Sequence, residues 1–274
     1  MKFIKKQNNL IQIELENGET VNVLVIPEGI EKVYGRAFMG LNDIKELSLP
    51  STFKGFIVGE ESDFLGLPRE LIKISVSDNN PLYKVTSDCL INTKAKRVEL
   101  ATSDAIIPQN EGIEVIGDYV FNQHFNISEI VVPANVKELG YMSLSGCSVK
   151  KITFLGSPKN ISPCALTNNR ELVEIVMPES EEYEVKDGCV IEKKTKTLLA
   201  VVKSAKIPYG IEKLEKGVFT LMPMENDVVI PETVQVVEAP EIMHIWGDKK
   251  FIIKKNSKLE KIFIQNNIKF EIID

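Results

Sequence analysis

The sequence predicts a mainly β, or mixed α/β, solenoid, in which short coils stack and each coil contacts only the coils before and after it. The first observation is a recurring phrase: Ile-Pro is followed by apolar residues at fixed offsets and then by the next proline, as between Pro27 and Pro50, 23 positions apart. The second is a longer repetition that puts Cys89 and Cys189 in equivalent places, 100 positions apart. Self-similarity at such periods is typical of stacked repeats.

The short phrase recurs along most of the chain, and its length drifts by a few residues. Such drift is ordinary in solenoids, because an insertion can bulge from one coil without disturbing its neighbours. Copies begin at Pro27, Pro108, Pro133 and Pro208, with an irregular copy over 161–178 and a degraded copy from Val234.

Each copy contains a short segment in which inward apolar residues alternate with one outward residue, as in Ile130-Val131-Val132. A period of two predicts a β-strand. The other segments of this kind are 47–50, 74–76, 152–154, 175–178 and 228–231. Each is too short to be stable alone, so we expect it to pair with its equivalents in neighbouring coils, giving one long parallel sheet with strands about 4.8 Å apart.

Two hairpin-like segments begin the longer repeats, over 80–91 and 183–191. We therefore expect a single domain over residues 1–274, with superunits of about 1–79, 80–179 and 180–274. Asn17-Gly18 is a strong turn signal between the apolar pairs Ile13/Leu15 and Val21/Val23. It predicts a third, divergent hairpin in the first superunit.

The repeated phrase, with its Ala-Phe pair and its closing Leu/Ile-Pro, resembles the BspA-like class of leucine-rich repeats, best over 25–50 and 112–133. The resemblance implies a right-handed leucine-rich-repeat solenoid with hairpin insertions and a short C-terminal capping helix. We expect this helix to begin near Ser257, because serine is a favourable N-cap residue. The pattern is blurred over 55–71 and 239–250, where the coil boundaries stay undefined.

The formal net charge of −6 and the pI near 5.3 argue against nucleic acid as a partner, because nucleic acid selects a basic surface. Lys2, Lys5 and Lys6 resemble the charged start of a signal peptide, but polar residues 7–9 follow where an apolar run is required. No stretch approaches the roughly 20 apolar residues of a membrane span. If Met1 is the native start, we expect a cytoplasmic protein; the resemblance implies a secreted or cell-surface protein if a leader was removed.

Catalytic and metal-binding patterns are scarce. The two histidines are His124 and His244, and Cys147 shares its repeat column with Leu41, His124, Asn169 and Met222, which predicts an interior rung. A zinc site of His124, Cys147 and Cys164 lacks the usual ligand spacing. No phosphate-binding glycine loop and no Gly-x-Ser-x-Gly elbow is present. We therefore predict no catalytic residue, no metal and no cofactor.

The candidate binding surface is the outward side of the predicted sheet, in two columns. The charged column, one residue before each inward position, contains Glu46, Lys73, Glu129, Lys151, Glu174, Asp227 and Lys250. The neutral column, one residue after each inward position, contains Ser48, Ser75, Val131, Thr153, Val176, Val229 and Ile252. β-Branched residues suit a pleated sheet, and opposite charges on neighbouring strands contribute about 0.2–1 kcal/mol per pair. A smooth apolar strip flanked by charges is also typical of a docking face.

We interpret the chain as a non-enzymatic, monomeric interaction module that presents these columns to a protein or peptide partner, without nucleic acid and without membrane insertion. One alternative is a hydrolase with paired carboxylates near the second hairpin, where Glu179, Glu181 and Glu182 cluster. Another is a self-associating structural protein, because the ends of a solenoid expose unpaired strand edges unless they are capped.

Overall fold

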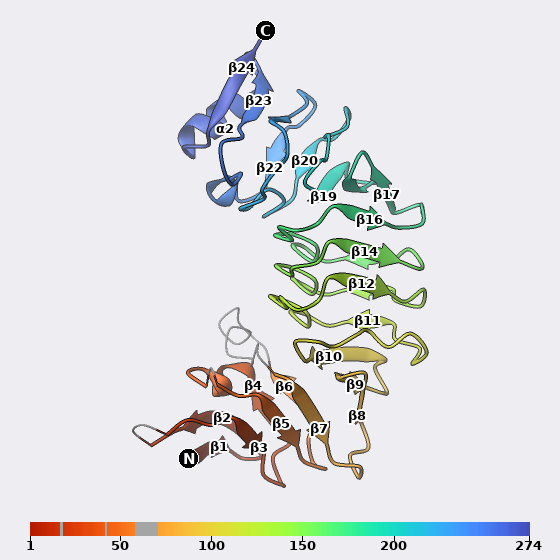
Figure 1. Cartoon of the computed structure of the whole chain (residues 1–274), viewed down its shortest axis with the longest axis vertical. Helices are drawn as coiled ribbons and strands as arrows, with labels where there is room; N and C mark the ends of the chain where they lie inside the picture. Colours follow the sequence, from red (N-terminus) through yellow and green to blue (C-terminus); the bar gives the residue numbers. More distant parts are fainter. Residues whose placement is uncertain (17–18, 42, 58–70) are drawn as a thin grey trace. The chain divides into compact units, whose positions relative to one another are not determined.

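The structure is a computed structural model that describes residues 1–16, 19–41, 43–57 and 71–274. The chain is a β-solenoid of mostly parallel strands, with one short α-helix among the described residues, near the C-terminus (Figure 1). The fold class is therefore as predicted. The described residues divide into two compact units, Met1–Glu111 and Gly112–Asp274, each with its own buried apolar cluster. The single domain over residues 1–274 stays a prediction.

Unit 1 begins with an antiparallel hairpin and continues as parallel coils. Its elements are β1 (Lys2–Lys6), β2 (Asn9–Glu14), β3 (Val23–Val25), β4 (Lys32–Tyr34), the 3-10 helix η1 (Gly35–Phe38), β5 (Glu46–Leu49), β6 (Gly55–Ile57), β7 (Lys73–Val76), β8 (Tyr83–Thr86), β9 (Cys89–Asn92) and β10 (Arg97–Ala101). Strands β3, β5 and β7 form one parallel sheet, and β1, β2, β4 and β6 form a second sheet that is parallel except for the β1–β2 pair. The hairpin predicted over 80–91 is present as β8–β9, with β10 antiparallel to β9.

The prediction of a first hairpin around Asn17-Gly18 is wrong in its pairing, and these two residues lie outside the described ones. The opening hairpin is β1–β2, where Gln7 has a φ of 57°. Strand β2, which carries Ile13, pairs with β1 and β4, and β3 pairs with β5. The reason is burial: Leu24 of β3 aligns with Leu47 of β5, and both are almost fully inaccessible. Pairing with the equivalent coil keeps this apolar rung in the core.

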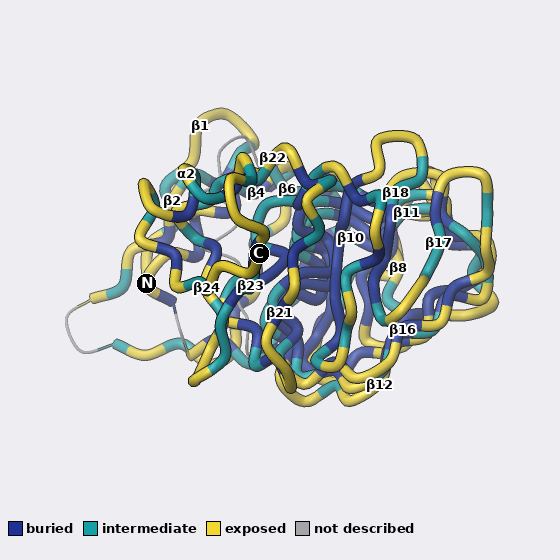
Figure 2. Tube along the Cα trace, turned by 90° about the horizontal axis from the view of Figure 1, so that it is seen from above, coloured by how far each residue is buried: buried dark blue, intermediate teal, exposed yellow. Residues whose placement is uncertain are grey.

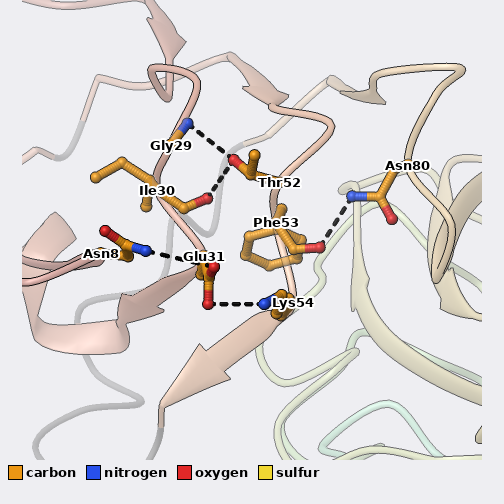
Figure 3. Close-up of polar contacts among 8 residues, drawn as sticks. All are labelled: Asn8, Gly29, Ile30, Glu31, Thr52, Phe53, Lys54 and Asn80. Atoms are coloured by element: carbon orange, nitrogen blue, oxygen red, sulfur yellow. Dashed lines mark hydrogen bonds and ion pairs between the residues drawn. The ribbon is translucent and has the colours of Figure 1, made fainter.

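Polar contacts repeat from coil to coil in unit 1 (Figure 3). The Thr52 hydroxyl accepts a hydrogen bond from the Gly29 N–H at 3.0 Å and donates one to the Ile30 carbonyl at 2.8 Å. Lys54 forms an ion pair with Glu31 at 2.8 Å, 23 residues away. The positive φ of Gly29, 88°, is one that glycine adopts without a steric cost. Each coil thus satisfies backbone groups of the preceding coil, which fixes the register of the stack.

Unit 2 has the same plan. Its elements are β11 (Val115–Ile116), β12 (Glu129–Val132), β13 (Glu138–Leu139), β14 (Lys151–Phe154), β15 (Asn160–Ile161), β16 (Glu174–Val176), β17 (Tyr183–Lys186), β18 (Cys189–Glu192), β19 (Thr197–Val201), β20 (Lys213–Leu214), β21 (Val228–Val229), β22 (Val236–Val237), the 3-10 helix η2 (Pro240–Ile242), β23 (Phe251–Lys254), α2 (Lys258–Gln265) and β24 (Phe270–Ile273). Strands β12, β14 and β16 lie side by side, and β17–β18 is the last predicted hairpin (Figure 1).

The predicted long parallel sheet is divided. Among the described residues it consists of three-stranded segments, β3-β5-β7, β12-β14-β16 and β21-β23-β24. The physical reason is that the chain between β7 and β12, and again between β16 and β21, forms the antiparallel hairpins. Figure 2 shows how burial alternates along the chain, with buried stretches in the strands and exposed ones at the turns. This alternation leaves one side of each segment facing outward.

Helix α2 lies where the capping helix is predicted, with Ser257 as its N-cap residue. The serine hydroxyl makes no capping hydrogen bond; instead the N–H of Asn256 donates to Glu260 at 3.1 Å. Leu259 and Phe263 are fully buried, and the Phe263 ring lies 5.5 Å from that of Phe251 on β23. The helix therefore covers the apolar end of the last described coils through these two side chains. The less regular stretch 239–250 contains η2.

Candidate functional site

The two predicted columns are in register on neighbouring strands. In unit 1, Glu46 lies opposite Lys73 and Ser48 opposite Ser75. In unit 2, the charged rung is Glu129, Lys151 and Glu174, and the neutral rung is Val131, Thr153 and Val176. Val229 lies opposite Ile252. The columns run along each sheet segment separately, so the geometry of the predicted surface is confirmed within each segment, and its binding role stays a prediction.

The charged column is largely engaged with itself. Lys73 forms an ion pair with Glu46 at 3.2 Å, and Lys151 with Glu174 at 2.8 Å. The hydrogen bond that the Lys151 ammonium group donates to Glu174 raises the pKa of Lys151, and the negative charge of Glu129 acts in the same direction. Exposed pairs of this kind contribute little to stability, because water and salt screen them. The charged column therefore aligns the strands and borders the surface.

The last two residues of the charged column, Asp227 and Lys250, also have polar partners. Asp227 accepts a hydrogen bond from the backbone N–H of Lys250 at 3.1 Å. The ammonium group of Lys250 pairs with Glu271 on β24, and this contact raises the pKa of Lys250. Glu271 lies opposite Ile252, so this ion pair joins the charged column to a neutral-column position on β24.

The neutral column carries exposed apolar side chains. Val131, Val176 and Val229 keep 37%, 41% and 52% of their surface accessible. Sequence reasoning missed the first strand of this surface: Val25 of β3 lies opposite Ser48 and is 57% exposed. The signal was present, because Val23 to Pro27 has the same alternation and the same closing proline as the later strands. Exposed valines on a sheet are not needed for the core, which makes them candidates for contact with a partner.

A hollow of about 470 Å³ lies at the end of the neutral column in unit 1. This sheet hollow is lined by Val25, Ser48, Ser75 and the turns that carry Glu28 and Asp78. The Glu28 carboxylate accepts hydrogen bonds from the Ser51 N–H at 2.8 Å and from its hydroxyl at 3.0 Å. These bonds, the backbone one first, lower the pKa of Glu28. The hollow thus combines an apolar floor residue, serine hydroxyls and a fixed negative charge.

In the acidic cluster near the second hairpin, Glu179 belongs to a surface ion pair with Lys193. Glu179 lies 2.6 Å from the Lys193 ammonium group and keeps 75% of its side chain accessible. The hydrogen bond that the Lys193 ammonium group donates to Glu179 lowers the pKa of this carboxyl group. A general acid needs the opposite shift, since it must hold a proton near neutral pH. The geometry of this carboxylate does not favour the hydrolase alternative.

The predicted interior rung is confirmed, since Leu41, His124, Cys147, Asn169 and Met222 are all buried. The thiol of Cys147 lies 2.9 Å from the Phe121 carbonyl, and burial raises its pKa to about 12. A thiol with such a pKa stays protonated at neutral pH and is a poor nucleophile or metal ligand. Within the part of the chain that the structure describes, no three His, Cys, Asp or Glu side chains are grouped as metal ligands.

Comparison with known proteins agrees with this architecture. Residues 11–109 and 100–219 match the family described as BspA type leucine rich repeat region, in six copies. The chain belongs to this family. Among solved structures, the BspA-type chain is similar to a leucine-rich repeat protein from Eubacterium ventriosum, with a TM-score of 0.55 at 18% identity over 79% of this chain and 56% of that one. No curated protein matches.

A second similar structure is a leucine rich cell surface protein from Faecalibacterium prausnitzii, with a TM-score of 0.51 at 15% identity over 92% of this chain and 73% of that one. At these identities the likeness concerns the fold. The BspA-type chain spans little more than half of the Eubacterium protein. Helices in the described residues are all too short or too polar to cross a bilayer.

Proposed function

We propose that this BspA-type solenoid is a non-catalytic interaction module, which binds a protein or peptide partner across the outward side of its sheet segments. The observation that carries the proposal is the contrast between the two columns. Four members of the charged column neutralise one another in the ion pairs Lys73–Glu46 and Lys151–Glu174, whereas the neutral column leaves Val131, Val176 and Val229 between 37% and 52% exposed. Burying such side chains against a partner yields about 25 cal/mol for each Å² removed from water.

The surroundings of the neutral column suit recognition of a polypeptide. Interfaces of this kind combine an apolar centre with a polar rim. Val131, Thr153 and Val176 supply the centre on β12, β14 and β16, and the paired charges of Glu129, Lys151 and Glu174 supply the rim. In unit 1 the sheet hollow of about 470 Å³ adds a recess for a single side chain.

We further propose that the protein acts at a bacterial cell surface. The support is the structural likeness to the Faecalibacterium protein, which is described as a cell surface protein. Fractionation of the native organism with an antibody against this chain tests the location. Recovery only from the soluble cytoplasmic fraction would contradict it, and the interaction surface would then face cytoplasmic proteins instead.

The binding proposal is tested by capture from a lysate and, separately, from surface-exposed proteins of the native organism, followed by titration of the purified partner. The combined Val131→Lys, Val176→Lys and Val229→Lys variant is expected to lose at least about tenfold in affinity, equivalent to about 1.4 kcal/mol. The melting transition should remain, because these side chains lie outside the core.

Val236→Lys is the matched control, since this valine is 46% exposed in unit 2 but belongs to the sheet that contains β20 and β22. It should bind as the unchanged protein does. A separate Ser48→Arg variant fills the sheet hollow and tests whether the partner also contacts unit 1. Full affinity in both the triple-lysine and the Ser48→Arg proteins would remove the outward sheet face from consideration.

A further inference from the structure

A row of side chains follows the buried rung at one corner of the coils in unit 2. Each member comes one position after a rung residue, as Phe125 follows His124 and Arg170 follows Asn169. Trp246 takes the same place in a later coil, because Ile245 before it forms a parallel bridge with the rung residue Met222. This corner column consists of Phe125, Ser148, Arg170, Pro223 and Trp246. It shares no residue with the charged or the neutral column and is therefore separate from the proposed interaction surface.

The corner column exposes two aromatic rings. Phe125 keeps 66% of its surface accessible and Trp246 keeps 55%. Packing of the coil does not require a ring at this place, since the same column holds Ser148 and Pro223 in other coils. Exposed aromatic side chains that the core does not use are enriched, together with arginine, at the centres of protein interfaces.

Arg170 connects the two rings. Its guanidinium lies 4.7 Å from the ring centre of Trp246. Arg170 and Phe125 also line one hollow, of about 390 Å³. Stacking on the indole face limits the motion of the guanidinium and leaves the N–H groups in its plane as donors. The column thus presents a held cationic fork beside two apolar faces.

The positive charge of Arg170 is not balanced by a carboxylate. In the part of the chain that the structure describes, its guanidinium forms no ion pair. Glu171 lines the same hollow but pairs with Lys203 at 2.9 Å, so that one positive charge is left over. The complementary group is a carboxylate, which accepts two parallel hydrogen bonds from a guanidinium fork.

The backbone behind the column is fixed before any ligand arrives. The buried side chain of Asn169, which precedes Arg170, donates to two backbone carbonyls, both at 2.9 Å, and accepts the N–H of Cys147 at 2.8 Å. The N–H of Trp246 donates to the Met222 carbonyl at 2.9 Å. A preorganised site loses less conformational entropy on binding.

We propose that the corner column is a second docking site, which binds an extended acidic peptide segment. An aspartate or glutamate side chain of this segment accepts hydrogen bonds from Arg170. Apolar side chains on either side of it pack on the rings of Phe125 and Trp246. The arrangement favours a peptide over a small anion, because a small anion would leave both rings in water.

The test is a selection on the full chain from a displayed library of random twelve-residue peptides. Peptides that the unchanged protein retains, and that the Arg170→Gln protein does not, are sequenced and synthesised. They are expected to carry aspartate or glutamate next to apolar residues. In calorimetric titrations, Arg170→Gln and Phe125→Ser should each weaken binding by at least about tenfold. Arg170→Lys keeps the charge but loses the planar fork, so its affinity should lie between those of the unchanged protein and Arg170→Gln.

Arg36→Gln is the matched control, because Arg36 lies 4.8 Å from the ring centre of Tyr34 in unit 1 and is outside the corner column. It should bind the selected peptides as the unchanged protein does. The triple-lysine protein should also bind them, so failure of the corner column and failure of the proposed interaction surface are separate results. Melting curves of all variants verify that they fold.

Three results would overturn the proposal. The first is that no peptide distinguishes the unchanged protein from Arg170→Gln. The second is that replacing the acidic residue of a selected peptide by its amide leaves the affinity unchanged. The third is that an oligomer of galacturonic acid displaces the peptide at a lower concentration than the peptide itself needs to bind, which would assign the corner column to an acidic glycan.

Discussion

The two hairpins, β8–β9 and β17–β18, are built from the same phrase 100 residues apart, yet they are fastened to the preceding coils in different ways. The Tyr83 hydroxyl accepts a hydrogen bond from the Asn92 side chain of its own hairpin at 3.1 Å and donates one to the Lys54 carbonyl of the preceding coil at 3.5 Å, and its ring lies 5.0 Å from Phe53. The Tyr183 hydroxyl accepts the backbone N–H of Ile161 at 2.9 Å. The repeat therefore fixes the residue and its place, and the neighbouring coil decides which bond it makes.

The turns of the two hairpins also differ, in the room that each leaves for a side chain. Both are two-residue turns with positive φ at each central residue, Ser87-Asp88 in the first and Asp187-Gly188 in the second. This is the type I′ geometry that hairpins favour. A Cβ on Gly188 would lie 2.6 Å from the Val202 side chain and 3.2 Å from the Ala205 backbone, whereas Asp88 carries its side chain exposed. Both turns accept a backbone hydrogen bond from the following chain, Asp88 from Thr102 at 3.0 Å and Gly188 from Val202 at 2.9 Å, but only the first leaves room for a side chain.

The largest expected loss of stability comes from adding a side chain to the second turn. Gly188→Ala adds a steric overlap to a left-handed backbone, so it is expected to lower the free energy of unfolding by about 2–4 kcal/mol. Asp88→Ala also places an alanine, at the equivalent position of the first turn, where a side chain already fits. It should lower the free energy of unfolding by about 1 kcal/mol. Calorimetric melting of the two variants checks the prediction. Equal losses would show that the Val202 contact does not constrain the second turn.

A smaller effect is expected from the tyrosine hydroxyls. Tyr183→Phe leaves the buried N–H of Ile161 without its acceptor, which costs about 1–3 kcal/mol. Tyr83→Phe affects the side chain of Asn92, which is half-buried, and should cost about 0.5–1.5 kcal/mol. Urea unfolding of both variants gives the comparison. Hydrogen exchange at Ile161 should accelerate only in Tyr183→Phe, and unchanged exchange there would contradict the assignment.

The smallest effect appears only in alkaline solution. Burial raises the pKa of Tyr83 to about 12, above its ordinary value of 10.0, and burial also raises the pKa of Tyr183. The folded state therefore holds these protons more tightly than the unfolded state. The associated stability is fully present below pH 10 and is lost as the pH rises towards about 12. Ultraviolet phenolate titration should show a delayed class of tyrosines that Tyr83→Phe diminishes; normal titration of Tyr83 would contradict its burial.

Much of the candidate surface could be predicted from the sequence. Strict alternation around Leu47, Ile130 and Ile152 is enough to say which residues face outward, because a one-residue slip would expose the whole apolar set. The register of Glu129 with Lys151, and of Val131 with Thr153, follows from aligning the repeats. Val25 could have been included by the same rule.

A second hollow in unit 2, the corner hollow of about 390 Å³, could not be found in this way. Three of its lining residues, Gln123, Gly146 and Asn168, share no chemistry that would mark them as a set. They come together because equal backbone corners stack, and because Gly146 leaves a space between the amides of Gln123 and Asn168. Only the packing of successive coils shows that this space is not filled by another side chain.

By itself, the sequence determined the solenoid, its buried rung, its two later hairpins and the closing helix, because each depends on a periodic pattern of burial that local residues carry. The tertiary structure decided the pairing of the first hairpin, the division of the parallel sheet, the partners of Tyr83 and Tyr183, and the corner hollow. These depend on which groups of distant coils meet, and a repeat pattern leaves that choice to packing and to the satisfaction of buried polar atoms.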